Sequence, residues 1–409
     1  LIRNLPGSAE DEFERDLYVI RRRIEKSAIA NQVDLYVCSL SCRSLIYKGM
    51  FLAEHLTVFY PDLLDPRFVS RFAIYHQRYS TNTFPTWKLA QPFRRLAHNG
   101  EINTISGNVN WMKSHETRLA DPVLDPFMED LKPVVQAQGS DTACFDNVFE
   151  LLTFAGRDAP MARCLMIPAS IGGNSAMTQR HKDMYSYCNA VMEPWDGPAA
   201  LCATDGRWMV AGLDRSGLRP LRYTITGSGL LIVGSETGMV KVPEADIVSR
   251  GRLGPGQSLA LDLKEAKLYG NDELLDLLSG RQDFSSWVKR TQEISSIVRP
   301  DGSEPVLYDA ETLRRRQLAV GLTLEDLETI LQPMVENAAE AIGSMGDDTP
   351  LAVLSDRYRG LAHYFRQAFS QVTNPPIDSL RETRVMSLVT RLGNLGNILE
   401  ESETQCDLL

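Results

Sequence analysis

The sequence predicts an α+β fold with stacked sheets in its first part and a mainly helical second part. Over residues 197–263, short apolar runs alternate with Asp-Gly, Ser-Gly and Pro-Gly, which is typical of antiparallel strands joined by tight turns. Over residues 310–343, apolar residues recur instead with helical spacing. We therefore expect a domain boundary near residue 290, which separates residues 1–290 from residues 291–409.

The chain is expected to open with a helix that is followed by strands. Residues 8–27 have the spacing of an amphipathic helix, and Ser8 with Asp11 predicts a capping box at its start. Three later runs combine apolar and β-branched residues between polar, Gly or Pro residues, which predicts strands. These runs are 35–41, 44–52 and 71–80.

Helices are expected again after a loop-rich stretch at 81–140. Residues 142–157 are predicted to be helical, with Gly156 near the end of the helix. In the second part, a further helix is expected over roughly 355–372, after which Pro375–Pro376 interrupts the pattern.

Composition and charge exclude several classes of protein. Hydrophobic residues make up 43% and charged residues 23% of the 409 residues, which excludes wholesale disorder. Acidic residues outnumber basic ones, 53 against 43, and no basic stripe favours nucleic-acid binding. No apolar run reaches the length of a membrane-spanning helix, and the first residues lack the apolar region of a signal peptide.

Cysteine usage predicts a protein of the reducing cytoplasm. The seven cysteines are an odd number, and most lie in apolar contexts such as LYVCSL and AALCAT, which is typical of buried free thiols. Cys38 and Cys42 are close in sequence but have no second Cys/His pair nearby. No metal site is therefore expected in this chain.

The motif HQRYST at residues 76–81 could bind a carboxylate. The guanidinium of Arg78 presents a fork of donors that matches two carboxylate oxygens, and Thr81 adds a hydroxyl. The alternative is a surface arginine with structural hydrogen bonds.

The motif HNGE at residues 98–101 could form an oxyanion hole. The side-chain amide of Asn99 and the backbone N–H of Gly100 are two adjacent donors that could point at one oxygen. The alternative is a hairpin turn, because Asn-Gly is the commonest two-residue turn.

The motif GSD at residues 139–141 could bind an ammonium group through the carboxylate of Asp141. The alternative is a helix N-cap, and the two are compatible because one oxygen can cap while the other faces a pocket. Arginine-rich turns at 205–207 and 214–220 could bind phosphate, although charged hairpin tips with internal ion pairs are the alternative.

In order and spacing, these motifs resemble the class II glutamine amidotransferases of the N-terminal nucleophile hydrolase superfamily. Longer strings resemble the glutamate synthase large-subunit family over nearly the whole chain: RYSTNTFPTWKLAQPFRRLAHNGEINTISGNVNWM, QGSDTACFDNVFELL, IPASIGGNSAM and QVTNPPIDSLRE. The resemblance implies a four-layer αββα fold whose front portion is missing from the chain. The mainly helical part would then be the beginning of an α/β central domain.

The resemblance also implies an activity, which is the release of ammonia from L-glutamine. The ammonia would pass through a tunnel to a second site, where its reductive transfer to 2-oxoglutarate gives two L-glutamate. Arg78 and Thr81 would bind the α-carboxylate of glutamine and Asp141 its α-ammonium. Asn99 and Gly100 would form the oxyanion hole.

Other parts of such an enzyme would lie outside this chain. The family's nucleophile is an N-terminal Cys, whereas residue 1 here is Leu, so the resemblance implies that the chain alone is inactive. FMN and a [3Fe-4S] cluster would bind downstream, and FAD and NADPH would bind a small (beta) flavoprotein subunit. The alternatives are another class II amidotransferase, or a non-catalytic glutamine-binding fragment.

Overall fold

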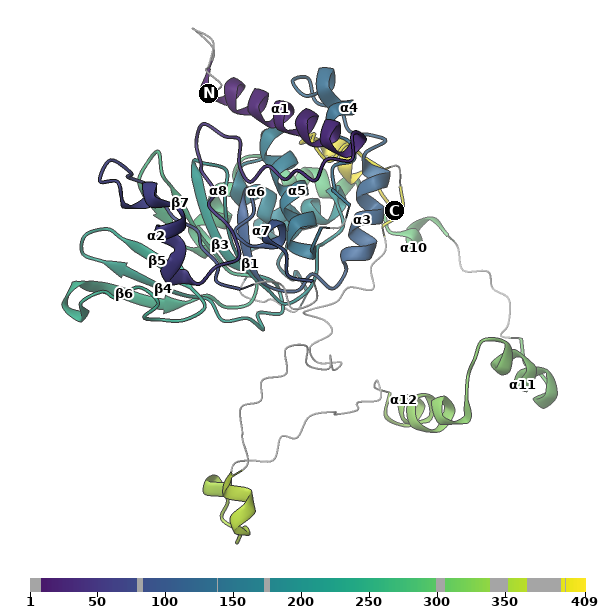
Figure 1. The fold of residues 1–409 in the computed structure, drawn as a ribbon. Helices are drawn as coiled ribbons and strands as arrows, with labels where there is room; N and C mark the ends of the chain where they lie inside the picture. Colours follow the sequence, from purple (N-terminus) through teal and green to yellow (C-terminus); the bar gives the residue numbers. More distant parts are fainter. Residues whose placement is uncertain are drawn as a thin grey trace. The chain divides into compact units, whose positions relative to one another are not determined.

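The computed structural model describes most of the chain, which divides into two compact units (Figure 1). The first unit contains Leu1–Gln292 together with Thr390–Leu409, and the second contains Glu293–Val389. The described residues are 9–78, 84–137, 139–172, 177–298, 306–338, 352–365, 391–393 and 395–409. The division into domains at residue 290 stays a prediction, because the last residues of the chain pack with the first unit.

Two antiparallel sheets form the centre of the first unit. In the described part of the chain, the larger sheet has the strand order β1-β2-β3-β7-β8 and the smaller one the order β5-β4-β6. The strands are β1 (Leu96–Gly100), β2 (Ala199–Thr204), β3 (Trp208–Leu213), β4 (Arg222–Thr226), β5 (Leu231–Gly234), β6 (Ile247–Arg252), β7 (Ser258–Asp262) and β8 (Lys267–Tyr269). The hairpin between β2 and β3 turns at Gly206, whose φ of +94° suits glycine.

Alternation along the strands separates two apolar cores. Leu201 and Val210 of the larger sheet belong to the main core, which this sheet shares with helices of the first unit. Ala211 and Leu213 point the other way and pack with Leu221, which precedes β4. The order helix, sheet, sheet confirms the predicted α+β class and provides three layers of an αββα arrangement.

The helical layer of the first unit consists of α5, α6 and α7, and α5 is the element that matters most for the site (Figure 1). Ser140 caps α5, with its Oγ accepting from the backbone N of Ala143 at 3.1 Å. The helices of this unit are α1 (Glu10–Ala30), α2 (Leu56–Phe59), α3 (Ile105–His115), α4 (Met128–Leu131), α5 (Asp141–Phe154), α6 (Ala159–Met166), α7 (Gln179–Val191), α8 (Asn271–Ser279) and α9 (Phe284–Trp287).

The C-terminal segment, residues 395–409, is part of the fold of the first unit. Ile398 is fully buried in its main core. The guanidinium of Arg157, itself buried, donates to the backbone O of Glu400 at 2.6 Å. Arg290 forms a two-pronged ion pair with Asp407, with distances of 2.7 and 2.9 Å. Residues near the end of the sequence therefore complete the main core of the first unit.

The second unit contains short helices in its described residues. They are α10 (Ile294–Ile297), α11 (Ala310–Ala319), a π-helical turn (Asp326–Leu331) and α12 (Gln332–Asn337). The carboxylate of Asp309 caps α11 by accepting from the backbone N of Thr312 at 2.9 Å. Of the helix predicted over 355–372, the described residues 355–365 contain a short 3₁₀ turn at Leu361–Phe365, whereas residues 366–372 and Pro375–Pro376 lie outside the described residues.

The local predictions succeeded unevenly. Helices at 8–27 and 142–157 are confirmed as α1 and α5. The N-cap of α1 is Ala9, without a side-chain bond, and Ser8 of the predicted capping box lies outside the described residues. The strands predicted at 35–41 and 44–52 are wrong, as is the described part of 71–80, because these runs join no sheet. The antiparallel strands of 197–263 are confirmed, although they divide between two sheets.

Candidate active site

Three of the five predicted site residues lie together, where β1 ends and α5 begins. Asn99 and Gly100 close β1, and Asp141 is the first residue of α5. One oxygen of Asp141, Oδ2, accepts from the backbone N of Ile102 at 2.9 Å, just beyond the strand. The carboxylate and the strand end are therefore fixed to each other by a direct hydrogen bond.

Asn99 and Gly100 belong to a strand and not to a hairpin turn. They pair with Ala200 and Ala199 of β2, so the turn interpretation of Asn-Gly is wrong. The φ of Gly100 is +141°, and a Cβ at this position would lie 1.8 Å from the backbone O of Pro198. Only glycine fits there, because backbone atoms occupy the space that a side chain would need.

The side chain of Asn99 is exposed and available. It points to the face of the sheet opposite the helical layer, because its strand neighbour His98 points toward α5. Its amide makes no hydrogen bond within the described residues. A free amide beside the backbone N–H of a glycine can donate to an oxyanion.

Asp141 is not the helix cap that was considered, since Ser140 takes that role. Oδ1 of Asp141 accepts from the backbone N of Thr142 at 2.7 Å and from its Oγ1 at 3.3 Å. With the bond from Ile102, the carboxylate receives three hydrogen bonds, whereas an ionised carboxylate can accept about four. It keeps capacity for a further donor such as an ammonium group.

His98 is a buried residue of the site that sequence reasoning missed. Its Nδ1 lies 3.0 Å from Oγ1 of Thr142, and its backbone N and O are both bonded by the amide of Gln91, at 2.7 and 2.9 Å. Its Nε2 has no hydrogen-bond partner among the described residues. Burial lowers the pKa of His98 to about 4, so the imidazole is neutral near pH 7.

A second contact fastens α5 to the segment before β1. The buried carboxylate of Asp146 accepts from the backbone N–H groups of Arg94 and Arg95, at 3.2 and 2.7 Å. Burial, together with the nearby charge of Glu150, raises the pKa of Asp146 to about 6. The strand and the helix that carry the site residues are thus tied at two points along α5.

Arg78 lies on an exposed segment without regular structure. Nδ1 of His76 lies 2.6 Å from the backbone O of Arg78 and 3.1 Å from its backbone N, which makes a local turn. His76 is also close enough to His98 to contribute to its lowered pKa. Thr81 lies outside the described residues. The segment with Arg78 is therefore near the site, but its guanidinium is not held in place by the contacts that fix Asp141.

Two arginines of the arginine-rich turns pair with carboxylates that lie outside those turns. Arg207 pairs with Asp262 at 2.6 Å, and Arg215 pairs with Asp196. The carboxylate of Asp205 accepts from the backbone N of Ala159 at 2.8 Å. These contacts favour the interpretation as charged hairpin tips over that of a phosphate site.

All seven cysteines of the chain are free thiols. Burial raises the pKa of each of them, to about 11 in Cys42 and Cys144. Because the thiolate is the nucleophile, thiols with raised pKa values react poorly near pH 7. These cysteines therefore have the properties of structural residues and not of an activated nucleophile.

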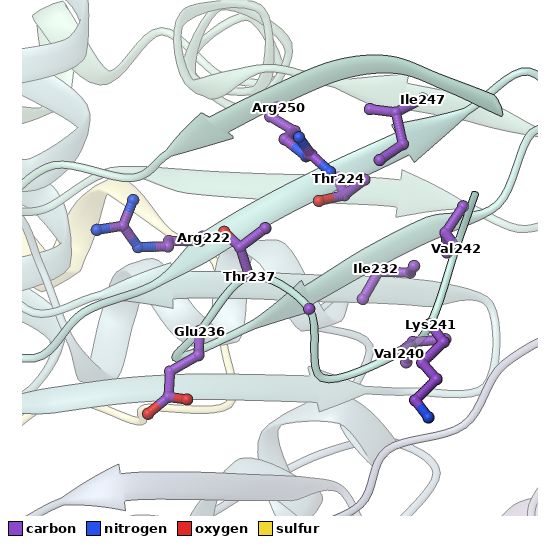
Figure 2. A pocket seen from close by; sticks show the side chains of 11 residues that line it. Arg222, Thr224, Ile232, Glu236, Thr237, Val240, Lys241, Val242, Ile247 and Arg250 are labelled. Carbon is purple, nitrogen blue, oxygen red and sulfur yellow. The ribbon is translucent and has the colours of Figure 1, made fainter. Parts of the chain in front are cut away.

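A cavity of about 230 Å³ lies away from these residues, on the smaller sheet (Figure 2). Its floor includes Thr224 and Ile247, and Arg222 and Arg250 lie at its edge. The guanidinium of Arg250 is paired with Glu244, at 2.6 and 2.7 Å. No predicted site residue lines this cavity, so the cavity and the candidate active site are separate features.

The described residues contain neither a metal-binding cluster nor a membrane-spanning helix. No group of three or more His, Cys, Asp or Glu side chains there could hold a metal ion. None of the helices in that part of the chain is long and apolar enough to cross a membrane.

Two family profiles match the sequence. The family described as "Glutamine amidotransferases class-II" matches residues 1–287, and "Glutamate synthase central domain" matches residues 315–409. A solved structure of glutamine phosphoribosylpyrophosphate amidotransferase from B. subtilis, complexed with ADP and GMP, has a TM-score of 0.25 and 22% identity. That match covers 48% of this chain and 34% of the other.

Several curated proteins are similar over almost the whole chain. The "Glutamate synthase [NADPH] large chain" of Azospirillum brasilense is 61% identical over 100% of this chain and 27% of its own length. "Ferredoxin-dependent glutamate synthase 2" of Synechocystis sp. is 44% identical over 96% of this chain and 25% of its own length. The large chain of Bacillus subtilis is 42% identical over 96% of this chain and 26% of its own length. The chain thus spans about a quarter of the length of these relatives.

Proposed function

Because the chain belongs to the class II glutamine amidotransferases, we propose that it carries the glutamine-binding part of a glutamate synthase large subunit. The proposed reaction of this part is the hydrolysis of the side-chain amide of L-glutamine, which releases ammonia. The match of residues 315–409 to the glutamate synthase central domain favours this over another class II amidotransferase.

The observation that carries the proposal is the direct fixation of Asp141 to the end of β1. The proposed site then has, at the end of β1, a carboxylate for the α-ammonium of glutamine and the oxyanion donors Asn99 and Gly100. Arg78 and Thr81 would bind the α-carboxylate from the neighbouring segment. Opposite charges for the two α-groups suit an amino-acid zwitterion and orient its side-chain amide toward the oxyanion donors.

In the proposed reaction the nucleophile would be an N-terminal cysteine thiolate. The amide carbonyl would become a tetrahedral intermediate, whose negative oxygen the oxyanion donors stabilise, and ammonia would leave as the thioester forms. Water would then release glutamate. Burial raises the pKa of all seven cysteines of this chain, so none of them has the properties of this nucleophile.

The rest of the proposed enzyme lies beyond the described site. The ammonia would pass to 2-oxoglutarate at an FMN site, with a [3Fe-4S] cluster that also belongs to the full protein. Electrons would come from NADPH through the FAD of a small (beta) flavoprotein subunit, and the enzyme would work in the cytoplasm.

The test is glutamine hydrolysis by the full-length protein that contains this chain. We expect Asp141→Ala to raise the KM for glutamine at least about tenfold, because a charged group that loses its partner typically loses 1.5–3 kcal/mol. Ammonia release that is absent from the full-length protein would contradict the proposed function. An unchanged KM in an active Asp141→Ala variant would contradict the role of Asp141 alone.

A further inference from the structure

The imidazole of His98 is buried between the two elements that carry the site, and the proposed reaction does not use it. Its side chain leaves β1 toward the helical layer, where Nδ1 meets Oγ1 of Thr142 at 3.0 Å. Thr142 is 1% exposed, so neither group exchanges this contact for water. The pair therefore joins the strand of Asn99 to the first turn of α5.

The hydrogen bonds around Thr142 have one consistent direction. Oγ1 of Thr142 donates to Oδ1 of Asp141 at 3.3 Å, so it is left to accept from Nδ1–H of His98. The imidazole is neutral because burial holds its pKa near 4, so it carries a single N–H. That N–H is on Nδ1, which leaves Nε2 as the unprotonated nitrogen without a partner. The charged or titratable groups that act on the ring are Asp141, His76, Arg219 and Glu101.

The position of the strand does not depend on this ring. The backbone N and O of His98 are held by the side-chain amide of Gln91, at 2.7 and 2.9 Å. Gln91 is itself buried, so this pairing persists when the imidazole is altered. The hydrogen bond from the imidazole to Thr142 is therefore not needed to hold the strand, and its effect passes through the Thr142 hydroxyl to Asp141.

We propose that His98 is a positioning residue of the glutamine site, which acts through the Thr142 hydroxyl to orient the Asp141 carboxylate toward the α-ammonium of the substrate. This inference rests on the proposed function. The bonds from Thr142 and Ile102 hold Oδ1 and Oδ2 of Asp141, so the plane of the carboxylate is fixed. When the Thr142 hydroxyl is lost, Oδ1 keeps only the backbone N–H of Thr142, so two hydrogen bonds instead of three orient the carboxylate.

The experiment uses the full-length protein with Thr142→Val and, as its matched control, Thr142→Ser. Valine has nearly the shape of threonine but no hydroxyl, whereas serine keeps the hydroxyl. We expect Thr142→Val to raise the KM for glutamine about tenfold with a smaller change in kcat, since a hydrogen bond to a charged group is involved. We expect Thr142→Ser to retain the KM of the wild type within about twofold.

A second ligand separates positioning from a general structural effect. Glutaric acid monoamide has the carboxylate and amide of glutamine but no α-ammonium, and its inhibition constant is measured against glutamine hydrolysis. We expect Thr142→Val to leave this constant unchanged, because the affected carboxylate has no partner on this ligand. An equal weakening of both ligands would overturn the proposal, as would a Thr142→Ser variant that resembles Thr142→Val.

The histidine itself is tested by His98→Asn and His98→Leu. The amide nitrogen of asparagine can replace Nδ1 as a donor to Thr142, whereas leucine cannot donate. We expect His98→Asn to keep the KM for glutamine within about threefold and His98→Leu to raise it about tenfold. The double variant His98→Leu/Thr142→Val should match Thr142→Val, because both changes break one chain of hydrogen bonds.

The outcomes distinguish this inference from the proposed function. A wild-type protein that releases no ammonia from glutamine contradicts the proposed function. If the wild-type protein is active and Thr142→Val has the same KM for glutamine as the wild type, only the positioning role is overturned. If His98→Leu does not fold, the comparison of Thr142→Val with Thr142→Ser still tests the proposal. Neither of these two variants changes the hydrogen bonds between Gln91 and the backbone of His98.

Discussion

The two halves of the candidate glutamine site differ in how they are built. Asn99, Gly100 and Asp141 lie on a strand and a helix that buried hydrogen bonds join together. Arg78 lies on an exposed segment whose described contacts are local ones with His76. The first half can hold its geometry without a ligand, whereas the described contacts of Arg78 do not fix its guanidinium.

The difference has a physical cause. The ties that join the strand to the helix in the first half connect residues far apart in sequence, such as Asp146 with the backbone of Arg95 at 2.7 Å. Such bonds are protected from water, and breaking them leaves buried groups unpaired. Arg78 itself makes no such tie within the described residues, so a substitution there should affect binding and not stability. Each prediction below tests this distinction.

The largest effect is expected from Gly100→Ala. A Cβ would lie 1.8 Å from the backbone O of Pro198, so the strand end and both oxyanion donors must move. We expect kcat of the full-length protein to fall by about a thousandfold or more, because one donor alone is worth about 10²–10³. The melting temperature should fall as well.

The matched control is Gly107→Ala. Gly107 lies within α3, and a Cβ there meets nothing within 4 Å. This change should leave kcat unaltered and raise stability by about 0.5–1 kcal/mol, because alanine favours the helix over glycine. A Gly100→Ala variant with normal kcat would mean that the strand end is not part of the site.

The next effect is expected from Asn99→Ala. The side chain is exposed and makes no hydrogen bond in the described structure, so its loss should not change the melting temperature. As an oxyanion donor, it should contribute about 10²–10³ in kcat. Asn110→Ala, which removes an exposed asparagine from α3, is the control and should change neither quantity. A similar kcat for both variants would exclude Asn99 from the oxyanion hole.

Much of the fold was readable from local sequence signals, whereas the site depended on long-range contacts. The hairpin at Gly206 was predicted because a turn residue and its flanking strands are neighbours in sequence. The Asn99–Gly100 turn signal was misleading because pairing with Ala200, about a hundred residues later, keeps this dipeptide in a strand. Local propensity is weak where such tertiary pairing is available.

The errors have the same origin. The apolar runs at 35–41 and 44–52 have strand composition, but no local signal reveals that they lack a partner strand. The contact of His98 with Thr142 joins residues 44 positions apart, and only an unusual histidine in the apolar run LAHNG could have suggested it. Likewise, nothing local predicts that Arg157 binds the backbone of Glu400.

A smaller effect is expected from Arg78→Ala, in the half without supporting contacts. If Arg78 binds the α-carboxylate of glutamine, its loss should raise KM by about tenfold to a hundredfold. The melting temperature should stay the same, because the side chain is exposed. Arg67→Ala, an exposed arginine paired only with Asp65 nearby, should alter neither quantity. A fall in melting temperature with Arg78→Ala would show that the Arg78 side chain makes stabilising contacts, as the residues of the other half do.

The smallest effect is the response of the buried half to acid. His98 has a pKa of about 4 when folded, below the value of about 6.5 in an unfolded chain, so the unfolded state binds more protons between these values. Its contribution to stability is therefore complete above pH 6.5 and declines as the pH falls toward 4. Between pH 7.5 and 5.5 this should cost about 1 kcal/mol.

Asp146 opposes this trend, which makes a direct comparison of variants necessary. Its folded pKa is raised to about 6, so the folded state binds the extra proton and gains stability as the pH falls through 6. Urea unfolding of the chain at pH 7.5 and 5.5 should show a smaller loss in His98→Asn than in the wild type, and a larger loss in Asp146→Asn. Equal losses in all three would mean that neither group is buried in the folded chain, and the contrast between the two halves of the site would then disappear.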